Sequence, residues 1–177
     1  MKCVLVGDTG VGKTSLVSRL VFDEVPSSHI PTIGAAFSEL VISGRTLSIW
    51  DTAGQEKYAS LASMYLRDAN LVLVVFDLTV QGGTDRISHW ISTALRHSPS
   101  ASIVVVGNKC DKGSNPIIAQ AVAETEHEYV ETSATTGAGI YDLTTRISKV
   151  MDGMGLSLCT EEGVCLDLRS DDRKRCC

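Results

Sequence analysis

The sequence contains no apolar run long enough to cross a membrane. Hydrophobic residues make up 44% of its 177 residues, but no run among them reaches the roughly 18 residues that a membrane-spanning helix requires. A glycine-rich segment begins at Gly7, which leaves too little chain before it for a signal peptide. We therefore expect neither a secretory leader nor a spanning helix, and any attachment to a membrane must come from elsewhere in the chain.

The sequence also lacks an excess of basic residues. Its 16 lysines and arginines are outnumbered by 21 aspartates and glutamates, which gives a net charge of −5. Nonspecific binding of nucleic acid requires a basic face that displaces counterions, so this class of function is disfavoured. The histidines are scattered, which favours surface or helix-capping roles over a metal site. They are His29, His89, His97 and His127.

A disulfide framework is missing as well. The six cysteines show neither the spacing of a small disulfide-bonded domain nor a C-x-x-C metal motif. Four of them, Cys159, Cys165, Cys176 and Cys177, lie close to the C-terminus. This usage predicts a reducing, cytosolic environment.

What the sequence does contain is an alternation of short apolar runs and helical patterns. The continuously apolar segments 72–76 and 103–106 are typical of strands buried on both faces of a parallel sheet. Ser43-Gly44-Arg45 predicts a hairpin turn between two strands that alternate more than the others. The predicted strands are Lys2–Val6, Ala36–Ile42, Thr46–Asp51, Asn70–Asp77, Ser102–Asn108 and Glu128–Thr132. The predicted helices are Lys13–Val21, Ala59–Leu66, Thr84–His97, Pro116–Glu126 and Ile140–Met151.

This order predicts a doubly wound α/β fold, with a mostly parallel six-stranded sheet and one antiparallel edge strand. The domain is expected to cover residues 1–151. From Asp152 onward the periodic pattern gives way to glycines and charges, so residues 152–177 are predicted to form a flexible tail. Ligands of such folds bind at the carboxyl ends of the strands. The motifs described next all fall at such ends.

The segment from Gly7 to Thr14 matches the phosphate-loop motif G-x-x-x-x-G-K-[ST] between a strand and a helix. Its glycines let backbone N–H groups surround an anion at a helix N-terminus. Lys13 can reach the outer phosphates, and the Thr14 hydroxyl is placed to ligate Mg²⁺. The predicted contacts are Asp8, Thr9, Gly10, Val11, Gly12, Lys13, Thr14 and Ser15.

A second motif, Asp51-Thr52-Ala53-Gly54-Gln55, follows the third predicted strand. A carboxylate opposite a phosphate loop suits a magnesium site, so Asp51 is a candidate metal residue. Gly54 can offer its N–H to a terminal phosphate, and Gln55 can orient an attacking water. Thr32, in the loop before the second strand, could ligate Mg²⁺ when a γ-phosphate draws that loop inward.

A third motif, Asn108-Lys109-Cys110-Asp111, ends the fifth strand and predicts selection of guanine. The Asp111 carboxylate can accept hydrogen bonds from N1–H and the exocyclic amine, a donor pair that adenine lacks. Asn108 can brace the phosphate loop, and the Lys109 stem can lie on the ring face. Ser133 and Ala134 end the sixth strand, where the Ala134 N–H could face the guanine carbonyl.

With these motifs in this order, residues 2–151 resemble the Ras superfamily of small GTPases. The segments Ile33 to Phe37 and Ile49 to Tyr58, with the terminal Cys176-Cys177, are most similar to the Rab family and its endosomal branch. The resemblance implies GTP or GDP with Mg²⁺, the catalytic residues Lys13, Gly54 and Gln55, and the metal ligands Thr14, Thr32 and Asp51. Slow hydrolysis is expected, assisted by a GTPase-activating protein.

The resemblance also implies protein partners and a membrane anchor. The expected effector-binding residues are Ile33, Phe37, Trp50 and Tyr65. Further expected partners are an exchange factor, an activating protein, a GDP-dissociation inhibitor and an escort protein. Cys176 and Cys177 resemble a double prenylation signal, and two lipid chains anchor stably where one is marginal. The protein is then expected in the cytoplasm, cycling to the cytosolic face of endosomal membranes.

Three residues depart from the family pattern. Val25 stands where relatives carry an aromatic over the nucleotide, so weaker nucleotide retention is expected. Thr9 crowds the site of water attack, and Thr135 replaces a lysine beneath the base. Two alternatives remain at this point: a phosphate-loop kinase or ATPase, and a GTP-binding adaptor with little or no hydrolysis.

Overall fold

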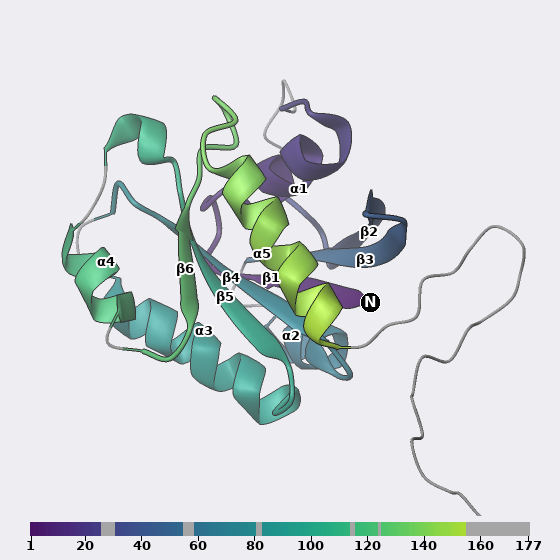
Figure 1. The fold of residues 1–177 in the computed structure, drawn as a ribbon. Helices are drawn as coiled ribbons and strands as arrows, with labels where there is room; N and C mark the ends of the chain where they lie inside the picture. Colours follow the sequence, from purple (N-terminus) through teal and green to yellow (C-terminus); the bar gives the residue numbers. More distant parts are fainter. Residues whose placement is uncertain (26–30, 55–58, 81–82, 114–115, 124, 155–177) are drawn as a thin grey trace, which may run out of the picture.

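The structure is a computed structural model, and it describes residues 1–25, 31–54, 59–80, 83–113, 116–123 and 125–154. The described strands are β1 (Lys2–Val6), β2 (Ala35–Ile42), β3 (Arg45–Thr52), β4 (Leu71–Asp77), β5 (Ser102–Asn108) and β6 (Glu128–Glu131). The described α-helices are α1 (Lys13–Phe22), α2 (Ala59–Leu66), α3 (Thr84–His97), α4 (Pro116–Ala123) and α5 (Ile140–Gly153). The predicted α/β fold is confirmed (Figure 1).

The strands form one sheet in the order β2-β3-β1-β4-β5-β6. All neighbours pair in parallel except β2 and β3, which are antiparallel and place β2 at the edge. Their hairpin turn consists of Ser43 and Gly44, both with positive φ, because Ile42 already pairs with Arg45. This backbone twist suits a two-residue turn between antiparallel strands. The predicted antiparallel edge is therefore confirmed, with Arg45 as the first residue of β3.

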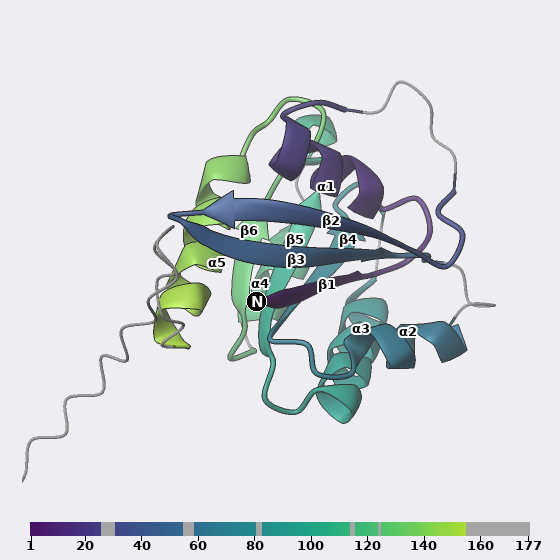
Figure 2. The same ribbon diagram turned by 90° about the vertical axis from the view of Figure 1, so that its right-hand side faces the viewer.

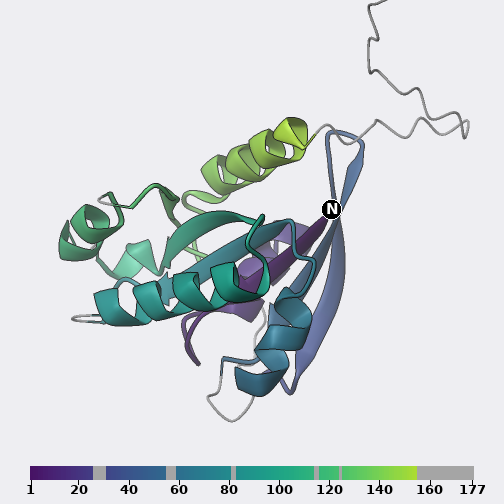
Figure 3. The same cartoon turned by 90° about the horizontal axis from the view of Figure 1, so that it is seen from below.

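Helices cover both faces of this sheet. Leu16 of α1 and Ile147 of α5 belong to one buried cluster, whereas Leu66 of α2, Ile91 of α3 and Ile118 of α4 belong to the other. Figures 2 and 3 show α5 and α3 on opposite sides of the strands. The residues of β4 alternate between the two clusters, which explains why this strand is apolar throughout its buried part.

Amphipathic periodicity explains why α3 forms where it was predicted. Its buried residues Ile87, Trp90, Ile91 and Ala94 follow the i, i+3, i+4, i+7 spacing of one helix face. Asp85 lies in the first turn, and basic residues lie in the last turn, where each opposes the helix dipole.

Two predicted elements, one helix and one strand, end earlier in the structure than in the prediction. Helix α4 ends at Ala123 instead of Glu126, because the Thr125 N–H and hydroxyl both donate to the Val122 carbonyl, at 2.9 and 2.7 Å. Strand β6 ends at Glu131 instead of Thr132, and the Thr132 hydroxyl donates to Asn108. Helix α5 continues to Gly153, two residues beyond the predicted Met151. The structure adds a short 3₁₀ helix, Cys110–Lys112.

Candidate functional site

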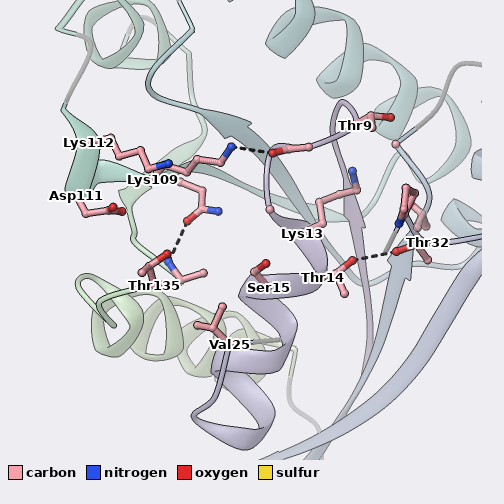
Figure 4. Close-up of a pocket in the computed structure, with 17 residues that line it drawn as sticks. Thr9, Lys13, Thr14, Ser15, Val25, Thr32, Lys109, Asp111, Lys112 and Thr135 are labelled. Atoms are coloured by element: carbon pink, nitrogen blue, oxygen red, sulfur yellow. Dashed lines mark hydrogen bonds between the residues drawn. The ribbon is translucent and has the colours of Figure 1, made fainter. Parts of the chain in front are cut away.

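A cavity of about 420 Å³ lies at the carboxyl ends of the strands (Figure 4). It is formed by the loop after β1, the segment before β2, the end of β3 and the loops after β5 and β6. Its lining consists of Thr9, Gly10, Gly12, Lys13, Thr14, Ser15, Val25, Pro31, Thr32, Thr52, Gly54, Asn108, Lys109, Asp111, Lys112, Ala134 and Thr135. The structure thus brings together the motifs that the sequence separates by more than a hundred residues.

The loop between β1 and α1 holds the buried side chain of Lys13. Its ammonium donates to the carbonyls of Gly7 and Asp8, both at 2.8 Å. Burial lowers the pKa of Lys13 to about 8, against the attraction of the Asp51 and Asp8 carboxylates. A buried cation at the start of a helix, surrounded by a glycine-rich backbone, is suited to a multiply charged anion.

Thr14, Thr32 and Asp51 meet beside Lys13. The Thr14 hydroxyl donates to Asp51 Oδ2 at 2.6 Å. The hydroxyls of Thr14 and Thr32 are hydrogen-bonded at 2.9 Å, and a dashed line marks this bond in Figure 4. Burial raises the pKa of Asp51, which is 2% exposed. Asp51 Oδ1 is buried and has no hydrogen-bond partner among the described residues.

These oxygens fit a magnesium ion. Mg²⁺ prefers hard oxygen ligands with few carboxylates, and the unpartnered Asp51 Oδ1 needs a cation or a water beside it. In the described ranges, no group of three or more His, Cys, Asp or Glu side chains is arranged to hold a metal ion. A metal site here therefore draws on the threonine hydroxyls as well as on Asp51.

Gly54 lies so close to the phosphate loop that a side chain has no room. An added Cβ would stand 2.5 Å from both the Asp8 carbonyl oxygen and Lys13 Nζ. The backbone N–H of residue 54 can thus approach a ligand held by Lys13. Gln55, the predicted water-orienting residue, lies outside the described residues.

At the other end of the cavity, Asn108 ties the base motif to the phosphate loop. Its Nδ2 donates to the Val11 carbonyl at 2.9 Å, as predicted, and its Oδ1 accepts the Ala134 N–H at 3.1 Å. We expected that N–H to face a guanine carbonyl, and a contact with the base stays a prediction. Ser133 Oγ donates to Asp111 Oδ1 at 2.5 Å and so orients the carboxylate that would read the base.

Lys109 links the same two motifs. Its ammonium donates to the Gly10 carbonyl at 2.8 Å and to Asp77 Oδ2 at 2.6 Å. Figure 4 shows Lys109 and Asp111 at one end of the cavity and Thr14 and Thr32 at the other. This placement suits an elongated ligand with a base at one end and a phosphate chain at the other.

Three of the predicted nucleotide contacts do not line the cavity. Val11 and Ser133 are buried, and the Asp8 side chain turns toward α3. There, Asp8 accepts hydrogen bonds from Arg86 and from Trp90 Nε1. The sequence analysis missed both partners, because a contact across 78 or 82 residues leaves no trace in local spacing.

Arg19 of α1 is another residue that the sequence analysis missed. Its guanidinium donates to the carbonyls of Ala134 at 2.8 Å and Thr135 at 3.0 Å, and it pairs with Asp23 at 3.0 Å. It therefore holds the loop after β6 against the helix that begins at the phosphate site. An arginine spaced four residues before an aspartate was the signal available in the sequence, and it indicates only a local ion pair.

The predicted effector residues form an aromatic row. The ring centroids of Phe37 and Trp50 lie 5.2 Å apart, and those of Trp50 and Tyr65 lie 5.5 Å apart. Phe37 is 53% exposed and Ile33 is 82% exposed, so both present apolar surface to the solvent. The row of Phe37, Trp50 and Tyr65 thus runs from β2 and β3 to α2, and the binding of effectors by these residues and Ile33 stays a prediction.

Comparison with known proteins identifies the family. The sequence profile of the Ras family matches residues 2–152. The chain belongs to the Ras family. It is 41% identical over 160 residues to the GTP-binding protein ypt5 of Schizosaccharomyces pombe, which covers 84% of this chain and 76% of that protein.

Two further relatives of this Ras-family chain are Rab proteins. Ras-related protein Rab-31 of Mus musculus is 37% identical over 168 residues, covering 88% of this chain and 85% of the relative. Ras-related protein Rab-22A of Mus musculus is 36% identical over 159 residues, covering 84% and 82%. The resemblance to Rab proteins is thereby confirmed.

Membership of the Ras family makes the chain a GTPase. This result decides against a phosphate-loop kinase or ATPase, and it does not favour the alternative of a non-hydrolysing adaptor. None of the helices that the structure describes combines the length and the hydropathy of a membrane span.

Proposed function

We propose that this Ras-family GTPase is a Rab-type molecular switch that recruits effectors to intracellular membranes, with endosomal membranes as its site of action. The observation that supports this proposal best is that one cavity is lined by Thr14 and Thr32 as well as by Asn108 and Asp111, with Asp51 bound to Thr14 beside it. Phosphate and metal groups lie at one end, and base-reading groups lie at the other.

GTP binds with its base beside Asp111 and its phosphates in the loop between β1 and α1. Ser133 presents the Asp111 carboxylate to N1–H and the exocyclic amine of guanine, while Asn108 keeps the base motif in register with the phosphate loop. Adenine in the same position would leave polar groups of the site unpaired, and this cost makes the site selective for guanine.

Hydrolysis then depends on positioning and charge neutralisation. Lys13 exchanges its two backbone carbonyls for phosphate oxygens, and the N–H of Gly54 donates to the terminal phosphate. Gln55 orients the attacking water. An activating protein supplies an arginine and also takes part in orienting the water. Thr9, in the lining of the cavity, crowds the path of that water and slows the unassisted reaction.

The metal site consists of Thr14, Thr32 and Asp51. When bound there, Mg²⁺ neutralises charge that develops on the phosphates. Thr32 belongs to the segment before β2, 18 residues after Thr14. If Thr32 binds the metal ion with GTP but not with GDP, the position of this segment and of the neighbouring surface depends on which nucleotide is bound. That surface carries Ile33 and Phe37, the exposed apolar residues that effectors would bind.

A prenylated C-terminus completes the proposed cycle. Cys176 and Cys177, which lie outside the described residues, would each carry one lipid chain. An escort protein and a GDP-dissociation inhibitor would handle the lipidated form, and an exchange factor would load GTP. Residues 152–177 then act as a tether between the GTPase domain, 1–151, and the membrane.

Competition binding tests the nucleotide assignment. We expect GDP, but not ADP, to displace a fluorescent guanine nucleotide from the wild-type chain, and Asp111→Ala to lose this preference. Thr14→Asn, which removes one metal ligand, should shift the preference toward GDP over GTP. Equal displacement by ADP and GDP would refute the assignment.

Single-turnover hydrolysis tests the switch. Gln55→Leu should retain GTP binding and prolong the GTP state, because the side chain that orients water is removed. Hydrolysis at the wild-type rate would exclude this role for Gln55. Binding of GTP without any hydrolysis by the wild-type chain, even with activating proteins of the Rab class, would instead support the adaptor.

A further inference from the structure

The second residue of the phosphate loop carries a negative charge, although the loop is built to bind an anion. Asp8 is bound from one side by α3, where Arg86 donates from Nε at 2.9 Å and from a terminal nitrogen to the two carboxylate oxygens. Trp90 Nε1 adds a third hydrogen bond at 3.0 Å. A carboxylate that receives a two-pronged guanidinium and an indole N–H has a fixed orientation.

The Asp8 backbone points the other way, into the catalytic machinery. Its carbonyl oxygen accepts Lys13 Nζ at 2.8 Å and faces the position that a Cβ on Gly54 would occupy. The charge of Asp8 also acts on Lys13, whose pKa it raises against the larger effect of burial. The carboxylate is therefore within electrostatic reach of the group that binds the outer phosphates.

We propose that Arg86 is a positioning residue that neutralises Asp8 and turns its carboxylate away from the phosphates, and thereby favours the triphosphate over the diphosphate. The inference rests on the proposed binding of guanine nucleotides in this cavity. Trp90, 9% exposed, fixes the side of α3 against which the carboxylate lies. A side chain of α3, a helix distant in sequence, thus neutralises the negative charge of the phosphate loop.

The electrostatic reason is a difference of charge between the two nucleotides. GTP carries more negative charge than GDP, so an unpaired Asp8 carboxylate repels GTP more strongly. Because the site is partly open to solvent and salt, we expect an effect of about two- to fivefold on the ratio of the two affinities. Removing the charge of Asp8 should cancel it.

The experiment measures the affinities of the full chain for GDP and for a non-hydrolysable GTP analogue, at low and at physiological salt. Arg86→Gln should weaken binding of the GTP analogue relative to GDP, more so at low salt. Arg86→Lys keeps the positive charge and should retain most of the wild-type ratio. The double variant Asp8→Asn/Arg86→Gln should restore the wild-type ratio, because no unpaired carboxylate remains.

Arg96→Gln is the matched control, since it removes the same charge from an exposed position ten residues further along α3. It should leave the ratio within experimental error. The inference is overturned if Arg86→Gln changes both affinities equally, if salt has no influence on its effect, or if Asp8→Asn fails to suppress it. A wild-type chain that binds neither nucleotide would refute the proposed function itself, whereas normal wild-type binding with an unaffected Arg86→Gln would refute only this inference.

Discussion

Arg19 shows how much one side chain can contribute to a binding loop that it does not enter. It holds the carbonyls of Ala134 and Thr135, while the Ala134 N–H and the neighbouring Ser133 hydroxyl orient Asn108 and Asp111. Thr135 lacks the lysine side chain expected beneath the base, so the loop depends on its backbone contacts. The guanidinium is suited to this role because its fork can bind two carbonyls at once.

Replacing Arg19 by glutamine should accelerate release of GDP. The loss of two charge-assisted hydrogen bonds loosens the loop that orients the base-reading side chains, and we expect a rate increase of about three- to tenfold. Stopped-flow exchange of a fluorescent GDP measures this rate. Asp23→Asn is the control, because it removes the 93% exposed partner of Arg19 and leaves the loop contacts intact. Equal release rates for Arg19→Gln and wild type would show that the loop holds its position without Arg19.

Asp8 makes a contribution to stability that depends on pH. Hydrogen bonds from Arg86, followed by Trp90, hold the pKa of Asp8 below its ordinary value, against the opposing effect of burial. Since the folded-state pKa is the lower one, the stabilisation is complete above the unfolded-state pKa of about 3.9 and disappears as pH falls through the folded value. About a third of the side chain is exposed, so the gain is modest, roughly 1 kcal/mol.

Urea denaturation of wild type and Asp8→Asn over a range of pH tests this contribution. The difference in the free energy of unfolding should be largest near neutrality and should shrink below about pH 4. Glu126→Gln, which removes an exposed carboxylate, is the control and should show a smaller difference. A difference for Asp8→Asn that is constant across this range would contradict the ion pair with Arg86.

At the scale of elements, the sequence predicted what local periodicity determines. The alternation in β2 and β3, the apolar runs of β4 and β5 and the helical face of α3 are all properties of neighbouring residues. The phosphate loop and the base motif were found for the same reason, because their residues are contiguous. Contacts between elements have no such signal, and the sequence analysis therefore missed the roles of Arg19 and Arg86.

Thr32 ties the segment before β2 to two other elements. Thr32 is joined to Thr14 of α1 and, at 3.4 Å, to Asp51 of β3, so three elements converge on the site that suits a metal ion. Thr32→Ala should weaken binding of a GTP analogue about tenfold, equivalent to ~1.4 kcal/mol, and leave the affinity for GDP nearly unchanged. The reason is that, in the proposed switch, Thr32 serves as a metal ligand only when the third phosphate is bound.

Isothermal titration with both nucleotides in the presence of Mg²⁺ measures this selectivity. Thr46→Ala, at an exposed position of β3, is the matched control and should behave as wild type. If Thr32→Ala weakened GDP and the GTP analogue alike, the contact would be a general support of the cavity rather than a sensor of the third phosphate.

At the scale of the whole molecule, the order of the strands explains where the site lies. The strands that follow β1 in the chain lie on both sides of it in the sheet, with β3 and β2 on one side and β4, β5 and β6 on the other. The connections that leave the carboxyl ends of the strands on the two sides therefore run in opposite directions from β1. Such a switch point leaves an open crevice at the carboxyl edge of a sheet. The phosphate loop lies there because it follows the central strand, and the base motif reaches the crevice from β5.

The same arrangement places the C-terminal end of α5 away from the base-reading loop. Helix α5 begins at Ile140, after the loop that holds Asp111, and ends at Gly153, where Asp152 pairs with Arg45 at the β2–β3 turn. The last turn of α5 therefore lies at the opposite end of the helix from the base-reading loop, as Figure 1 shows.

Membrane binding should then depend on the number of lipidated cysteines and little on the GTPase domain. Cys177→Ser should lower the membrane-bound fraction, and Cys176→Ser/Cys177→Ser should abolish it, because one chain binds marginally and two bind stably. Fractionation and imaging of an N-terminally tagged chain measure this, with Cys159→Ser/Cys165→Ser as the control that should stay bound. GTP hydrolysis by the purified double variant should be unchanged, since the cavity is complete without the tail. A double variant that remained on membranes would refute the lipid anchor, and attachment would have to come from a protein partner bound at Ile33 and Phe37.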